Sequence, residues 1–204
     1  MREYIERSMT FARYTKLIDD LLADGRTTGE NQSEAMTGYA ILNRQRMRRL
    51  DKTTVLGDGL KKAAHDLSRK MTWLIITEGW CGDAAQNIPV IEKIAAESDK
   101  IETRYILRDE NLGLMDQYLT AGARSIPKLI AIDPETDEVL GTWGPRPAAG
   151  QSLFAQMKLD GTEKSVILEE MQRWYNADKT ASVQSEFEGL LKEWGNRRSA
   201  TARV

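Results

Sequence analysis

The spacing of apolar residues changes once along the chain, near residue 71. Before this point apolar side chains recur at the helical period, which predicts helices over residues 2–23, 33–50 and 59–69. Asp24 and Gly25 supply an end for the first of these helices, and Ser33 supplies an N-cap for the second. The first third of the chain is therefore predicted to be all-helical.

From residue 71 onward, short apolar runs rich in β-branched residues alternate with helical stretches. The run Thr-Trp-Leu-Ile-Ile-Thr at residues 72–77 is typical of a buried strand. Further strands are predicted over residues 101–107, 128–132 and 139–143, and helices over residues 83–97, 112–119, 152–157, 163–177 and 183–194. This order predicts a small mixed sheet that begins with a parallel crossover, ends in a hairpin and is flanked by helices.

These elements define the predicted fold class and its division into domains. The fold class is α/β, with an α/β domain over residues 70–195 and an all-helical N-terminal extension over residues 1–69 that packs on it. Residues 196–204 are predicted to form a flexible tail. The length of 204 residues suits one full core with an extension and is short for two ordinary domains.

Charge and composition argue against several classes of partner. The net charge is −2 and 41% of the residues are hydrophobic, which indicates a globular protein without a field that attracts nucleic acid or an anionic membrane. No apolar run approaches the ~18 residues of a membrane span, and residues 1–10 lack the apolar stretch of a signal peptide. We therefore expect a cytoplasmic protein that binds neither nucleic acid nor membranes.

The predicted helix over residues 33–50 is rich in arginine. Its inward stripe consists of Met36, Ala40, Asn43, Met47 and Leu50. The arginines fall on the remaining surface, spread rather than focused: Arg44, Arg46, Arg48 and Arg49. This pattern favours a packed helix with a solvated outer face over a nucleic-acid patch, and the arginines could pair with acids such as Asp109 or Glu110.

The chain holds one cysteine, Cys81, and therefore cannot form an intramolecular disulfide. Since His65 is the single histidine, metal sites built from Cys and His are nearly excluded, and neither a metal nor a cofactor is expected. Cys81 falls between a predicted strand and a predicted helix, where the helix N-terminus lowers the pKa of a thiol and makes it a better nucleophile. The alternative is a small residue of the helix–sheet packing, although a position at this turn argues against deep burial.

Four features of the sequence resemble those of the thioredoxins. Residues 80–84, Trp-Cys-Gly-Asp-Ala, resemble the Trp-Cys-Gly-Pro-Cys segment of that family, and Pro89 stands where thioredoxins carry the proline that kinks the following helix. Residues 124–130, Arg-Ser-Ile-Pro-Lys-Leu-Ile, resemble the segment whose cis-proline, here Pro127, faces the active cysteine. The predicted order of strands and helices is similar as well.

The chain is also similar to a group of bacterial thioredoxin-like proteins that share a Trp-Cys-Gly-Asp-Ala-Ala site, a helical extension and a Trp-Gly-Pro-Arg-Pro segment, here residues 143–147. The resemblance implies a thioredoxin fold with Cys81 as the catalytic nucleophile. The substrate-binding residues that it implies are Trp80, Gly82, Asp83, Ile126 and Pro127. Residues 143–147 alone fit either an interaction surface anchored by Trp143 or Arg146, or a fixed turn.

Three departures from the thioredoxin pattern bear on chemistry. Ala84 replaces the second cysteine, and Ile75 replaces the buried acid that precedes the nucleophile, so the residues that resolve a mixed disulfide are missing together. Asp83 replaces the proline between the cysteines. Its carboxylate stabilises a helix N-terminus but disfavours a thiolate two residues away, and these two effects on Cys81 oppose each other.

Three functions follow from this pattern. The first is monothiol thiol–disulfide exchange, in which Cys81 reacts with protein or glutathione disulfides and an external thiol such as glutathione resolves the product. The second is a redox-inactive binding or scaffold protein on a thioredoxin fold. The third is an iron–sulfur cluster held by one thiolate per protomer and completed by glutathione. The sequence does not indicate an oligomeric state.

Overall fold

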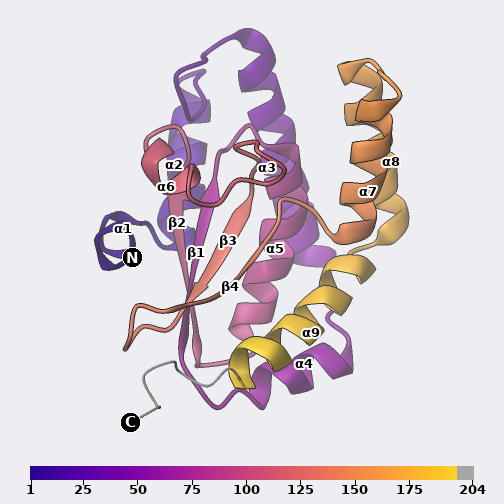
Figure 1. The fold of residues 1–204 in the computed structure, drawn as a ribbon. Coiled ribbons are helices and arrows are strands. Elements are labelled where there is room, and N and C mark those ends of the chain that lie inside the picture. Colours follow the sequence, from indigo (N-terminus) through magenta and orange to yellow (C-terminus); the bar gives the residue numbers. More distant parts are fainter. Residues whose placement is uncertain (197–204) are drawn as a thin grey trace.

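The computed structural model describes residues 1–196 and is built around a mixed four-stranded sheet with the order β2-β1-β3-β4 (Figure 1). The strands are β1 (Met71–Thr77), β2 (Ile101–Leu107), β3 (Lys128–Ile132) and β4 (Val139–Trp143). β1 runs parallel to β2 and antiparallel to β3, and β4 runs antiparallel to β3. The predicted α/β class, with its parallel crossover and closing hairpin, is confirmed.

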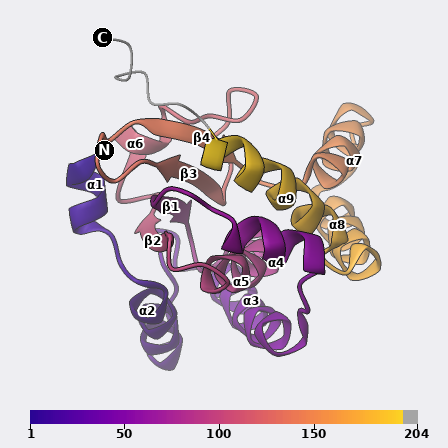
Figure 2. The same ribbon diagram turned by 90° about the horizontal axis from the view of Figure 1, so that it is seen from below.

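Helices cover both faces of this sheet. They are α1 (Arg2–Arg7), α2 (Phe11–Ala23), α3 (Glu34–Thr53), α4 (Asp58–His65), α5 (Gly82–Ala96), α6 (Leu112–Met115), α7 (Ala148–Leu159), α8 (Lys164–Asp178) and α9 (Ala181–Asn196). Figure 2 shows α4, α5 and α9 on one side of the sheet and α1 and α6 on the other. Because α3 packs against α5, a helix of the N-terminal part lies beside the residues that follow β1.

The single helix predicted over residues 2–23 is wrong, because the chain leaves the helical conformation between α1 and α2. Here Met9 pairs with Tyr105 at the edge of β2, through backbone hydrogen bonds of 2.7 and 2.8 Å. Thr10 then caps α2 by accepting a hydrogen bond from the backbone N–H of Arg13 at 3.3 Å. Met9 thus fits the helical spacing of the sequence but pairs instead with the exposed edge of β2.

Other helix bounds differ from the prediction at their ends. α4 ends at His65 instead of residue 69, and α6 ends at Met115 instead of residue 119. α7 is longer than predicted, because it begins directly after Pro147, which occupies its N-cap. Asn196, the first residue of the predicted tail, is the last residue of α9, and residues 197–204 lie outside the described part of the chain.

The apolar side chains form two separate clusters. The main core unites the sheet with α2 to α5 and α9, and it includes an aromatic group of Trp73, Trp143, Phe187 and Trp194. The second cluster is small and lies within the hairpin of α7 and α8, around Met157, Ile167 and Met171. Figure 1 shows this hairpin standing to one side of the sheet. Within residues 1–196, no helix combines the length and apolar character needed to cross a membrane.

Candidate functional site

Cys81 is the N-cap of α5, at the point where the chain leaves β1. Its sulfur accepts a hydrogen bond from the Ala84 backbone N–H at 3.4 Å and donates one to the Ile126 carbonyl oxygen at 3.3 Å. Only 7% of the residue is exposed, so the expectation that its position at the turn would keep it from deep burial is wrong. The reason is tertiary: α3 packs on α5, and Ile126 covers the thiol from the other side.

This burial sets the protonation state of Cys81. Burial, followed by the charge of Asp83, raises the pKa of the thiol to about 12, against the lowering effect of the Ala84 N–H and the charge of Arg146. The helix N-terminus lowers the pKa of Cys81 and Asp83 raises it, but each effect is smaller than the rise caused by burial of the thiol. At neutral pH the group is a neutral thiol that donates a hydrogen bond to the Ile126 carbonyl oxygen.

Two peptide bonds near the site are cis, Ile126–Pro127 and Gly144–Pro145. The segments that carry them touch, since a Cβ atom on Gly144 would lie 2.2 Å from the Pro127 carbonyl oxygen. Gly144 has a φ of 104°, a conformation that side chains rarely adopt. The loop after β4 is thereby held against the loop that faces Cys81.

Asp83 connects the start of α5 to the α7–α8 hairpin. Its carboxylate forms an ion pair with Arg146 at 2.7 Å and accepts a hydrogen bond from the Tyr175 hydroxyl at 2.8 Å. Burial raises the pKa of Asp83, while the charge of Arg146 is the largest opposing influence. Asn87, one turn along α5, donates to the same Tyr175 hydroxyl at 3.1 Å. The carboxylate thus lies against the hairpin and ties it to the main core.

The segment at residues 143–147 is an internal turn. Trp143 is 6% exposed and donates its indole N–H to Glu186 at 2.7 Å. Arg146 is occupied by Asp83, and its guanidinium stacks 3.8 Å over the Phe154 ring. Both side chains are engaged within the protein, which favours the fixed turn of the two interpretations of this segment.

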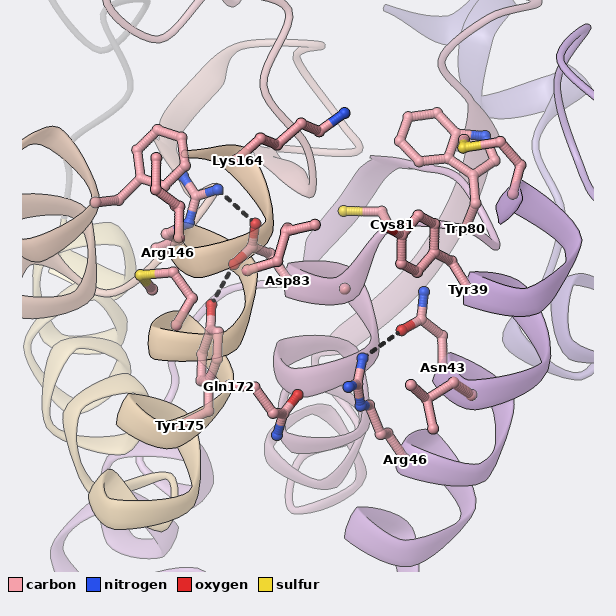
Figure 3. A pocket seen from close by; sticks show the side chains of 17 residues that line it. Tyr39, Asn43, Arg46, Trp80, Cys81, Asp83, Arg146, Lys164, Gln172 and Tyr175 are labelled. Atoms are coloured by element: carbon pink, nitrogen blue, oxygen red, sulfur yellow. Dashed lines mark hydrogen bonds and ion pairs between the residues drawn. The ribbon is translucent and has the colours of Figure 1, made fainter. Parts of the chain in front are cut away.

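A cleft of about 280 Å³ opens beside Cys81, between α3 and the α7–α8 hairpin (Figure 3). Its walls are mainly apolar: Met36, Tyr39, Leu42, Phe154, Ile167, Leu168 and Met171. Tyr39, Leu42 and Leu168 are each between 42% and 44% exposed, and it is their grouping around one cleft, not the exposure of each, that is typical of a binding site.

Some of the site residues predicted from sequence line the cleft, and others do not. Trp80, Cys81, Gly82 and Asp83 all line it. Ile126 and Pro127 do not line it, and Ile126 lies behind the thiol, where its carbonyl oxygen accepts the thiol proton. The other wall comes from α7 and α8, which sequence reasoning did not connect with the site.

The arginines of α3 divide between two roles. Arg44 and Arg48 form ion pairs with Asp19 of α2, at 2.8 and 3.0 Å, so the suggested partners Asp109 and Glu110 are wrong. The buried stripe of this helix is as predicted for Ala40, Asn43, Met47 and Leu50, while Met36 lines the cleft. Arg46 also lines the cleft.

Glu78 is a buried acid that sequence reasoning missed. It is fully buried between β1 and Cys81, and its backbone carbonyl oxygen accepts a hydrogen bond from the Cys81 N–H at 3.1 Å. One carboxyl oxygen accepts the Asp109 N–H at 2.9 Å, and the other has no partner among residues 1–196. Burial raises the pKa of Glu78 to about 7. The signal for it in the sequence is an acid directly after an apolar strand. The thioredoxin pattern places its buried acid at the position of Ile75 instead, which is also fully buried.

Comparison with known proteins places the fold. A family model described as thioredoxin matches residues 29–158, a segment that includes α3, α4 and the sheet. A protein of unknown function, PA1234 from Pseudomonas aeruginosa, is 18% identical with a TM-score of 0.60, over 94% of this chain and 96% of that one. An HIV epitope-scaffold is 16% identical with a TM-score of 0.53, over 90% of this chain and 98% of that one. No curated protein matches the sequence.

Proposed function

The chain belongs to the thioredoxin family, and we propose that it uses the family's site to bind a small, mainly apolar ligand in the cleft beside Cys81. The observation that carries this proposal is the cleft itself, which is lined by partly exposed apolar side chains and bordered by a buried thiol. Clefts of this kind, with a few polar groups among apolar walls, are the usual form of small-molecule sites. Cys81 belongs to the wall of the site as a neutral group.

Leu168 offers a direct test of the cleft. We expect Leu168→Glu to weaken the binding of Nile red, an uncharged apolar dye, about tenfold or more, because it removes apolar contact area and places a charge in the cleft. Binding is measured by the rise in dye fluorescence on titration with protein. The matched control is Val166→Glu, since Val166 lies on the same helix with 45% exposure against 44% for Leu168 but does not line the cleft. Equal loss in both variants, or no dye binding by the wild type, contradicts the proposal.

The second candidate is single-thiol exchange with a protein or glutathione disulfide. The contact between the Cys81 sulfur and the carbonyl of Ile126 across the cis-Pro127 loop favours it, because that loop faces the reactive cysteine in the thioredoxin pattern. In this reaction the thiolate attacks one sulfur of the disulfide, the other sulfur leaves as a thiolate, and an external thiol such as glutathione resolves the mixed disulfide. The raised pKa of Cys81 opposes it, since the thiolate is the attacking species.

The reactivity of Cys81 separates the two candidates. At pH 8 we expect iodoacetamide to alkylate Cys81 more than ~100-fold more slowly than an ordinary exposed cysteine, because its pKa is about 12. Mass spectrometry gives the rate for this single-cysteine chain, and the Cys81→Ser/Ser165→Cys variant provides an exposed cysteine in the same fold. Rapid alkylation of Cys81, together with glutathione-coupled disulfide reduction that Cys81→Ser abolishes, would establish exchange instead.

A further inference from the structure

Resting on the proposed function, we propose further that the natural ligand of the cleft is a small amphipathic anion, with an apolar chain between α3 and α8 and an acidic group on Arg46. The two parts of such a ligand match the two parts of the site. The walls are mainly apolar, and three cationic side chains line the cleft: Arg46, Arg146 and Lys164. Arg146 is paired with Asp83, so the charge available to a ligand comes from Arg46 and Lys164.

Arg46 is the stronger of the two anion-binding groups. Its guanidinium donates to the Asn43 side-chain oxygen at 2.9 Å, and among the described residues it forms no ion pair with an acid. Asn43 is itself buried and donates to the Gly79 carbonyl oxygen at 3.3 Å, so the guanidinium is held by a fixed neighbour. A guanidinium has five donors, and the neutral contact with Asn43 leaves most of them available to a carboxylate.

Among the described residues, Arg46 has no paired acid, in contrast to two other arginines of α3. Arg44 and Arg48 are both paired with Asp19, whereas Arg46 is half-buried and faces the cleft (Figure 3). Burial and the nearby charge of Arg49 lower the pKa of Arg46, which means that its charged form is poorly compensated in the free protein. An anion in the cleft supplies that compensation.

Lys164 stands at the opposite side of the cleft, at the first turn of α8. Its side chain is exposed and takes part in no ion pair within residues 1–196. Figure 3 shows it reaching over the cleft toward Cys81. Among residues 1–196, Asp83 is the only acid that lines the cleft, and it is neutralised by Arg146, so the cleft as a whole favours a negatively charged occupant.

The size of the cleft selects a small molecule over a peptide helix. Its volume of about 280 Å³ is at the low end of the range for ligand pockets, and it is walled on two sides by helices. A single alkyl or aryl chain with one carboxylate fits these dimensions. We therefore expect medium-chain carboxylates to be representative ligands.

Isothermal titration calorimetry with decanoate, decanol and decyltrimethylammonium tests this assignment, because the three share a chain and differ in charge. We expect decanoate to bind most tightly and Arg46→Gln to weaken its binding about tenfold, since a charge-assisted hydrogen bond is lost. Arg46→Lys should recover part of this loss, and decanol should bind wild type and Arg46→Gln equally. Arg48→Gln is the matched control, since Arg48 lies on the same helix, pairs with Asp19 and does not line the cleft.

The outcomes separate the ligand class from the proposed function. If decanol or decyltrimethylammonium binds as tightly as decanoate, or if Arg46→Gln leaves decanoate binding unchanged, the anionic class is wrong while the apolar cleft remains a binding site. If none of the three binds and Nile red also fails to bind, the proposed function itself is wrong.

Discussion

Arg146→Leu should lower the free energy of unfolding by roughly 3 kcal/mol, the cost of leaving one member of a buried ion pair without its partner. The side chains of Arg146 and Asp83 are 11% and 15% exposed, so water replaces little of what the lost guanidinium supplied. Asp83 would keep only the hydrogen bond from Tyr175. Urea unfolding at pH 7 measures the loss, and the same variant should weaken dye binding because the α7–α8 hairpin loses one of its attachments to α5.

Two controls separate this effect from the general loss of a large side chain. Arg146→Leu combined with Asp83→Asn should regain more than half of the lost stability, because no unpaired charge remains and the amide still bonds Tyr175. Arg173→Leu removes an exposed arginine whose ion pair with Glu169 is worth little, and it should cost less than ~1 kcal/mol. A loss for Arg146→Leu as small as that for Arg173→Leu would show that the Asp83 pair does not hold the hairpin.

Glu78→Gln should make the protein more stable at pH 8 while changing little at pH 5. The pKa of Glu78 is about 7 in the folded protein against an ordinary value of 4.5, so between these values the folded state holds a proton that the unfolded state has lost. Stability from this group is therefore present below pH 4.5 and falls as the pH rises through about 7. Each unit of pKa difference is worth ~1.4 kcal/mol, so the shift from 4.5 to about 7 predicts a gain of roughly 3–4 kcal/mol for the variant at pH 8.

Thermal unfolding of wild type and Glu78→Gln across pH 4 to 9 measures this dependence. Glutamine retains an oxygen for the Asp109 N–H and places an amide where the unpartnered carboxyl oxygen lies. Glu110→Gln is the control, since Glu110 is exposed and its variant should follow the wild-type profile. A stability difference between Glu78→Gln and wild type that does not vary with pH would mean that Glu78 has the same pKa in the folded and unfolded states.

Much of the fold could be predicted because the strands carry their own signal. The bounds predicted for β2, β3 and β4 are correct, since each strand carries apolar or β-branched residues and is flanked by polar or turn residues. The thioredoxin fold inferred from residues 80–84 and 124–130 is confirmed by the family match. The break at Met9 was missed because it depends on a partner, Tyr105, that is distant in sequence.

The site was less predictable, because its properties come from tertiary contacts. The place of Cys81 at the start of α5 follows from local sequence, but its burial depends on α3 and Ile126. The pairing of Asp83 with Arg146 joins the start of α5 to the turn before α7, and no local pattern marks it. The cleft was missed for the same reason, because its second wall belongs to a hairpin that is held in place by tertiary contacts such as this pair and the bond from Gln86 to Gln172.

The separate apolar cluster of the α7–α8 hairpin has a consequence for kinetics. The hairpin is joined to α5 through side-chain hydrogen bonds, among them the 2.9 Å bond from Gln86 to Gln172 and the contacts of Asp83 and Asn87 with Tyr175. Water can replace such hydrogen bonds, whereas separating a shared apolar core exposes apolar surface to water. Local opening of the hairpin therefore costs less free energy than global unfolding. The residence time of a molecule held in the cleft is then governed by how often the hairpin opens, while the main core around Cys81 stays folded.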